Sequence, residues 1–109
     1  MDLEKNSDFE TLNRDAEDYL SSYLNECVLI DEVQRMPRLF PLLRAMVDEN
    51  RKPARYIITG SVSPELLKGA SESLAGRVYY FYLNPIGLHE LPDTIRLKNT
   101  GSGVAFLKL

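Results

Sequence analysis

Three short apolar runs, separated by segments with helical periodicity, constrain the fold of this chain most. The runs are "CVLI" at 27–30, "RYIITGS" at 55–61 and "VYYFYL" at 78–83. A continuous apolar run is typical of a strand buried on both faces, as in parallel sheets, and β-branched and aromatic residues favour strands. The runs therefore predict three strands of one sheet.

Segments with helical spacing precede each of these strands. Apolar residues recur at about the helical period in residues 9–24, which predicts one or two amphipathic helices there. A second stripe predicts a helix between the first two strands, with Pro37 in its first turn. The stripe consists of Leu39, Leu42, Leu43, Met46 and Val47. A third helix is expected to begin at Ser63, Pro64 and Glu65, which supply a cap, a first-turn proline and a first-turn acid.

The alternation of helix and strand predicts an α/β fold built from parallel β-α-β units. In such sheets, ligands bind outside the carboxyl ends of the strands. Asp31 and Glu32 follow the first strand, and Thr59 and Ser61 close the second. We therefore expect two carboxylates and two hydroxyls on the same edge of the sheet.

Bulk properties exclude several classes of protein. The length of 109 residues favours one domain, and a net charge of −3 does not indicate nucleic-acid binding. No apolar run approaches the roughly 18 residues of a membrane helix, and the acidic start "MDLEKNSDFE" is unlike a signal peptide. A single cysteine forms no internal disulfide, and we expect a cytoplasmic location.

An aspartate and a glutamate at a strand end suit magnesium-nucleotide hydrolysis. Mg²⁺ prefers oxygen ligands and keeps several waters, so one carboxylate can hold it. The next carboxylate can deprotonate a water for in-line attack on a phosphoryl group. Acid pairs also occur at strand ends simply because the chain reaches the surface there, so the pattern alone leaves both interpretations open.

The motifs "VLIDEVQ", "ITGS" and "SLAGR" occur in that order within residues 28–91. This stretch resembles the AAA-type P-loop ATPases of bacteria and archaea, with "VLIDEVQ" as the Walker B motif. "MDLE" and "DAEDYL" show a weaker similarity to the second strand of that family and the segment after it. The resemblance implies a three-layer α-β-α fragment of a P-loop NTPase fold with a mainly parallel sheet.

The resemblance also implies roles for individual residues. Asp31 would be the Walker B acid that binds Mg²⁺, and Glu32 would be the catalytic base. Thr59 and Ser61 lie at the sensor position, and Ser61 is the slightly preferred of the two, although it could equally serve only as a turn or cap. Arg77 would stabilise the γ-phosphate within the subunit or across an interface, or it could simply pair with an acid or cap the last helix. Mg²⁺ and ATP are the implied cofactors.

The sequence departs from the family in two respects. The pattern G-x-x-x-x-G-K-[S/T], whose amides and lysine hold the phosphates, is absent, so we expect no useful ATP hydrolysis by this chain alone. Residues 1–93 are expected to form a partial ATPase core. Residues 94–109 form a divergent tail with a predicted hairpin between Ile95/Leu97 and Val104/Phe106.

A missing central strand follows from the same comparison. In the family's sheet order, 5-1-4-3-2, strand one lies between the strands that correspond to 55–61 and 78–83. Three outcomes are expected for the gap in this chain. The two flanking strands pair directly with each other, the run Val104–Leu109 fills the gap, or a strand of another chain fills it. The leading hypothesis is a truncated AAA-type ATPase domain. The alternative is a non-enzymatic interaction module that pairs through its open sheet edge, by self-association or with a partner chain that supplies the missing strand.

Overall fold

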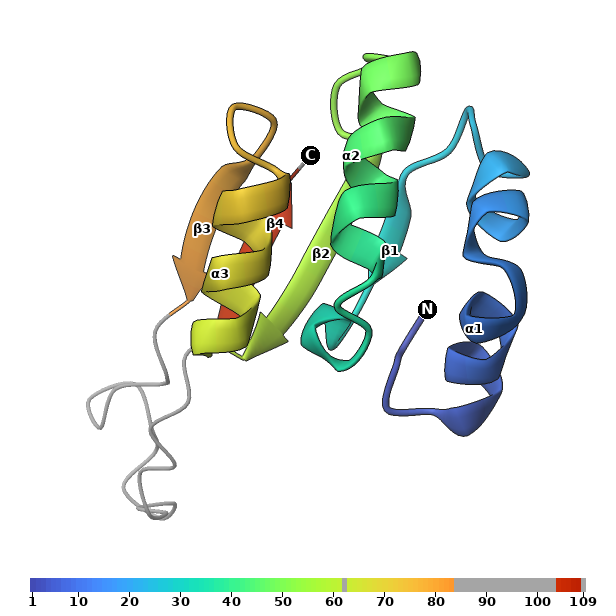
Figure 1. Cartoon of the computed structure of the whole chain (residues 1–109), viewed down its shortest axis with the longest axis horizontal. Helices are drawn as coiled ribbons and strands as arrows, with labels where there is room; N and C mark the ends of the chain where they lie inside the picture. Colours follow the sequence, from blue (N-terminus) through green and yellow to red (C-terminus); the bar gives the residue numbers. More distant parts are fainter. Residues whose placement is uncertain (62, 84–103, 109) are drawn as a thin grey trace, which may run out of the picture.

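Helices and strands alternate along the chain in the predicted order (Figure 1). The computed structural model describes residues 1–61, 63–83 and 104–108. Its elements are α1 (Asn6–Ser21), β1 (Val28–Ile30), the short 3-10 helix η1 (Val33–Arg35), α2 (Leu39–Glu49), β2 (Tyr56–Ser61), α3 (Pro64–Ser73), β3 (Tyr79–Leu83) and β4 (Val104–Lys108). The predicted α/β class is confirmed, and the arrangement is compatible with a fragment of a P-loop fold.

Side-chain caps mark the break within α1 and the start of α3. α1 is interrupted at Asp15, whose φ of −158° and ψ of 87° are not helical, which explains why the pattern fitted either one helix or two. The Asp15 carboxylate accepts a hydrogen bond from the Asp18 backbone N–H at 3.0 Å and so caps the second half of α1. At the start of α3, Ser63 Oγ accepts from the Leu66 N–H at 3.1 Å, as the sequence predicted.

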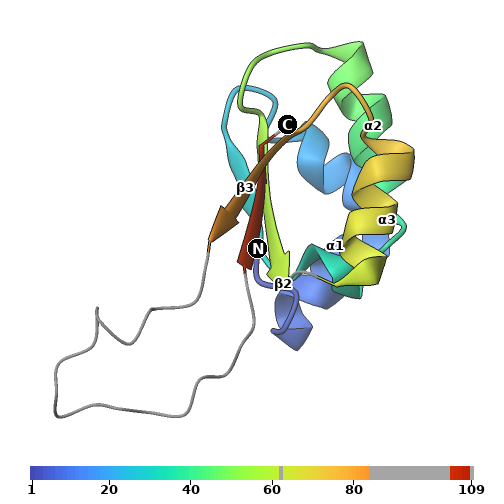
Figure 2. The ribbon, with the colours of Figure 1, turned by 90° about the vertical axis from the view of Figure 1, so that its left-hand side faces the viewer.

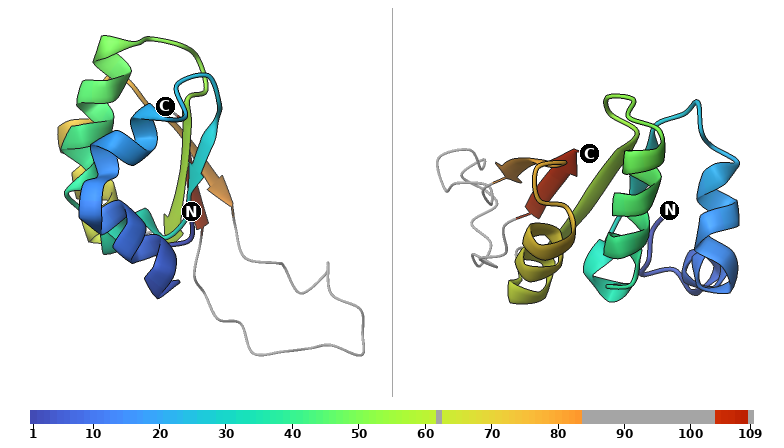
Figure 3. Two further views of the ribbon diagram at one scale, coloured as in Figure 1. Left: turned by 90° about the vertical axis from the view of Figure 1, so that its right-hand side faces the viewer. Right: turned by 45° about the horizontal axis from the view of Figure 1, so that its top comes forward.

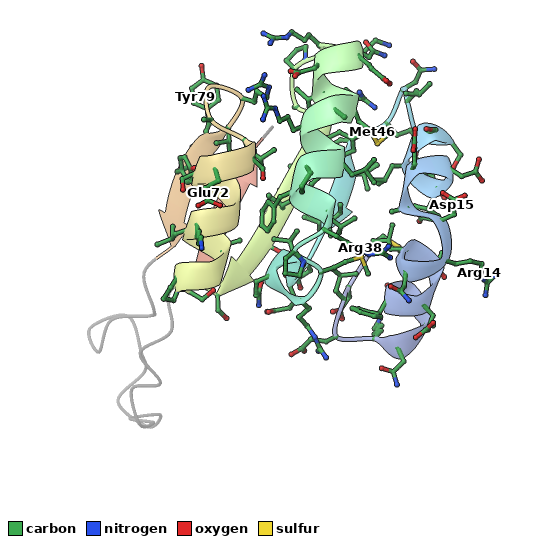
Figure 4. The ribbon with its side chains drawn as sticks, in the orientation of Figure 1. Arg14, Asp15, Arg38, Met46, Glu72 and Tyr79 are labelled. Carbon is green, nitrogen blue, oxygen red and sulfur yellow. The ribbon has the colours of Figure 1, made fainter. Side chains whose placement is uncertain are left out.

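Arg38 joins α1 to the start of α2. Its guanidinium donates to the backbone oxygen and to the side-chain oxygen of Asn13, both at 2.8 Å. Figure 4 shows the Arg38 side chain between these two helices. The contact fixes α1 beside α2, where Leu12 and Leu20 of α1 are fully buried. No helix in the described part of the chain is long and apolar enough to cross a membrane.

The first two strands form the predicted parallel pair. β1 and β2 are in register at Val28↔Tyr56 and Ile30↔Ile58. The amino terminus extends the sheet on the other side of β1, where Asp2 forms a parallel bridge with Asp31. This bridge places "MDLE" where the family resemblance puts its second strand.

β4 fills the gap in the sheet. The strand order in the described residues is β1-β2-β4-β3, and β4 is antiparallel to both neighbours (Figure 1). β2 and β3 are therefore parallel to each other, with one strand position between them. Of the three outcomes expected for this gap, the structure shows the one in which the C-terminal run fills it. Ile95 and Leu97 lie outside the described residues, and Val104–Lys108 pairs with β2 and β3.

The three described α-helices cover a single face of the sheet, as Figures 2 and 3 show. Side chains of alternate strand residues, such as Ile30, Tyr56 and Ile58, are buried against these helices. The opposite face has no helix among the described residues, and Leu29 and Phe81 are 49% and 54% exposed. The described part thus has two layers, whereas the resemblance implied three. The mainly parallel sheet also has an antiparallel strand at its centre.

The central position of β4 predicts a strong proline effect. Ala105 pairs with Gly60 on one side and with Tyr82 on the other. Ala105→Pro should lower the free energy of unfolding by about 2–3 kcal/mol, because proline removes a ladder hydrogen bond and leaves its partner unpaired. Ala105→Gly keeps the N–H and should cost only about 0.5–1 kcal/mol. Urea denaturation measures both, and equal losses would contradict the central placement of β4.

Candidate functional site

Asp31 and Thr59 lie side by side at the ends of two neighbouring strands. Because β1 and β2 are parallel and Ile30 pairs with Ile58, the next residue of each strand reaches the same edge of the sheet. The Thr59 hydroxyl donates a hydrogen bond to Asp31 Oδ1. The structure therefore brings together the acid of one strand tip and a hydroxyl of the next, as the sequence pattern predicted.

Further hydrogen bonds hold both the carboxylate and the backbone of Asp31. Oδ1 also accepts a hydrogen bond from the Glu32 N–H at 3.0 Å. The Asp31 backbone is fixed by the amino terminus, since its N–H donates to the Met1 carbonyl at 2.8 Å and its carbonyl accepts from the Leu3 N–H at 3.1 Å. Among the described residues, no group donates to Oδ2. One carboxylate oxygen is therefore oriented and the other is left for a ligand.

This arrangement fits the requirements of Mg²⁺. The described residues contain no cluster of three or more His, Cys, Asp or Glu side chains that could hold a metal. Mg²⁺ does not need one, because it keeps several waters and binds through one or two carboxylates together with substrate phosphates. Asp31, partly buried with one unengaged oxygen, matches that mode of binding.

Glu32 has an unusual backbone conformation for a residue with a side chain. Its φ of 57° and ψ of 41° lie in the left-handed region, which costs roughly 1–2 kcal/mol for a non-glycine residue. Its carboxylate accepts a hydrogen bond from Gln34 Nε2. Strained backbone of this kind is found disproportionately at functional sites. The contact between Glu32 and Gln34 was not predicted from the sequence.

The two sensor candidates differ in their surroundings. Thr59 is buried and contacts Asp31, whereas Ser61, two residues further on, is exposed and makes no side-chain hydrogen bond with the described residues. Ser61 is the last residue of β2 and pairs with Val104 of β4. Of the two hydroxyls, only that of Thr59 is placed to orient the acid.

Arg77 lies at the opposite edge of the sheet from the acids. It precedes β3, and β1, β2 and β3 run in the same direction, so the start of β3 is remote from the carboxyl ends of β1 and β2. Figure 4 labels the adjacent Tyr79 at that far end. Arg77 binds Asp48 with two hydrogen bonds, Nε to Oδ1 at 2.6 Å and Nη2 to Oδ2 at 2.9 Å. Within one chain, the structure does not bring Arg77 to Asp31.

The hydroxyl of Thr59 should contribute measurably to stability. Thr59→Val keeps the shape but removes the donor, and hydrogen bonds to charged groups are worth about 1.5–3 kcal/mol. Ser61→Ala removes an exposed hydroxyl and should change the free energy of unfolding by no more than about 0.5 kcal/mol. Chemical denaturation of both variants tests the contact. Equal effects would show that Thr59 and Asp31 do not interact.

The Arg77–Asp48 pair predicts a pH dependence. The hydrogen bonds from Arg77 lower the pKa of Asp48 below its ordinary value of 3.8. A carboxyl with a lowered pKa in the folded state stabilises the protein above the unfolded pKa and loses this contribution as the pH falls through the folded pKa. Asp48→Asn should therefore flatten the loss of stability below about pH 4. Arg77→Gln should flatten it in the same way, and an unchanged acid slope in both variants would refute the pairing.

Comparison with known proteins is consistent with this arrangement of motifs. A protein of Mycobacterium bovis and one of Mycobacterium tuberculosis, both described as uncharacterised, are each 49% identical to this chain over 70 residues. The matched region is 64% of this chain and only 16% of each relative. No solved structure gives a significant match. The family described as "AAA domain" matches residues 1–92. The chain therefore belongs to the AAA domain family, an AAA-type P-loop ATPase-like family.

Proposed function

We propose that this chain is the magnesium-binding part of an AAA-type ATPase domain. The observation that supports this most is the contact between Asp31 and Thr59, on neighbouring parallel strands at the carboxyl edge of the sheet. Ligands of α/β proteins bind at this edge. Family membership makes Mg²⁺ and a nucleotide the expected ligands.

In this proposal, Asp31 binds the metal through Oδ2. Its other oxygen accepts from the Thr59 hydroxyl and the Glu32 N–H, which fix the plane of the carboxylate. A Mg²⁺ ion held there would neutralise charge on the phosphate oxygens of a bound nucleotide. Thr59 then orients the metal-binding acid, and Ser61 stands at the same strand tip, exposed and available to a phosphate oxygen or a water.

Glu32 serves as the general base. Its left-handed backbone turns the chain from β1 into η1, and its carboxylate stays at the edge of the sheet, half-buried, in contact with Gln34. A base must lie within hydrogen-bond reach of the water it deprotonates. Glu32 follows Asp31 directly in the chain, and this role requires that its carboxylate reach a water bound near the metal.

Arg77 acts across a subunit interface in this proposal. Arg77 lies at the amino end of β3, remote from Asp31 and Glu32 of the same chain. It would therefore bind the γ-phosphate of a nucleotide held by a neighbouring subunit. In this role Arg77 would have to leave Asp48, a pair with side-chain exposures of 20% and 37%. The planar guanidinium that now binds a carboxylate has the geometry to bind phosphate oxygens.

The chain alone is expected to bind Mg-ATP weakly and to hydrolyse it poorly. The given sequence has no glycine-rich lysine loop, and phosphoryl transfer depends on positioning and charge stabilisation of the phosphates. A partner chain that supplied such a loop on a strand would have to displace β4, which occupies the position between β2 and β3.

A non-enzymatic interaction module is the second candidate. The face of the sheet that carries no described helix exposes Leu29, Tyr79 and Phe81, with Tyr79 73% exposed. Tyr79 and Phe81 are neighbours on one face of β3, whereas Leu29 lies on β1 at the other side of the sheet, and large exposed apolar side chains can mark surfaces for protein contacts. This candidate predicts pairing with another polypeptide through the sheet and needs no nucleotide.

Calorimetric titration with Mg-ATP tests the first proposal. The chain should bind no tighter than millimolar, because the given sequence has no glycine-rich lysine loop to hold the phosphates, and Asp31→Ala should weaken the residual binding further. Glu17→Ala, an exposed acid on α1 far from the strand tips, is the matched control and should leave binding unchanged. Micromolar binding, or equal residual binding by the wild type and Asp31→Ala, would overturn the proposal.

A further inference from the structure

Gln34 contacts both strand tips of the candidate site. It lies in η1, directly after the two acids. Its Nε2 donates to the carboxylate of Glu32, and its Oε1 is buried above Gly60 of β2 without a hydrogen-bond partner in the described part of the chain. A single amide thus connects the candidate base to the neighbouring strand.

Gly60 is required there for space. A Cβ at position 60 would collide with Gln34 Oε1, would lie 3.2 Å from its Cδ and would lie 3.6 Å from a methyl group of Leu66. Gly60 does not have a positive φ, since Gly76 is the only described glycine that does. The missing side chain, and not an unusual backbone conformation, is therefore what position 60 supplies.

The orientation of the Gln34 amide follows from the same contacts. An ionised carboxylate only accepts hydrogen bonds, so Nε2 must face Glu32 and Oε1 must face Gly60. A buried oxygen without a donor is unfavourable, and most buried polar atoms in native proteins have a partner. Stability alone does not explain why an amide occupies this place.

We propose that Gln34 is a positioning residue for the carboxylate of Glu32. The absence of a side chain at Gly60 leaves the space that the Gln34 amide needs. The inference rests on the proposed role of Glu32 as the base. The tip of β2 then fixes both acids, since Thr59 orients Asp31 and Gly60 admits the amide that orients Glu32. Glu32 has a strained backbone, and without Gln34 its carboxylate would have no hydrogen-bond partner among the described residues.

A double-mutant cycle tests whether Gly60 is needed to make room for the Gln34 amide. Gly60→Ala should destabilise the full chain when Gln34 is present and should cost much less in a Gln34→Ala background, where the methyl group has room. We expect the two substitutions to be coupled by about tenfold or more in the unfolding equilibrium constant. Gly69→Ala is the matched control. A Cβ at position 69 would meet the Phe40 ring at 2.7 Å, so its cost should be the same in both backgrounds.

The side-chain amide signals of Gln34 in NMR spectra test the positioning role. In the wild type, these signals should be displaced from those of a free glutamine amide by the contact with the Glu32 carboxylate. Glu32→Ala and Gly60→Ala should each move them towards the free position, while Ser61→Ala should leave them unchanged. If the Gln34 amide does not bind the Glu32 carboxylate, its signals should not respond to Glu32→Ala.

The possible outcomes are decisive and independent of nucleotide binding. If Gly60→Ala does not fold but the double variant Gly60→Ala/Gln34→Ala does, the collision between position 60 and the Gln34 amide is supported. If neither variant folds, the inference is overturned. Additive free energies, or Gln34 signals that ignore Glu32→Ala, also overturn the inference. Neither measurement uses ATP, so micromolar Mg-ATP binding, or binding that does not depend on Asp31, would refute the proposed function and leave this contact standing.

Discussion

The tip of β2 is the point on which the described structure depends. This strand pairs in parallel with β1 and antiparallel with β4, so it joins the two halves of the sheet. Its last residues also hold the candidate site, because Thr59 donates to Asp31 and Gly60 leaves room for Gln34. The pairing of β1 with β2 thus positions the acids, and a shift in their register would separate Asp31 from Thr59.

Local signals in the sequence were sufficient for much of the fold. The apolar runs predicted β1, β2 and β3, and the Ser63 cap predicted the start of α3. The carboxyl edge of parallel strands predicted that acids and hydroxyls would lie together. Which hydroxyl contacts the acid depends on register, and the sequence does not define that register. The exposed position of Ser61 and the contact of Thr59 could therefore not be separated beforehand.

Features that depend on distant segments were not predictable in this way. β4 is antiparallel between two strands that precede it by about twenty or more residues along the chain, and its own sequence fits several partners. Arg55 was read only as part of a strand, but its buried guanidinium donates to the Met46 carbonyl at 2.8 Å near the end of α2. The partner of Arg77, Asp48, is 29 residues away and had no local signal.

The central claim is that two adjoining strand tips form one side of a magnesium site. Paramagnetic broadening by Mn²⁺ in an amide NMR spectrum of the full chain tests it directly, because broadening falls off steeply with distance from the bound ion. The account predicts that amides of residues 31–34 and 59–61 lose intensity first. Broadening that begins instead at the exposed acids of α1, Asp15, Glu17 and Asp18, with the strand tips unaffected, would contradict it.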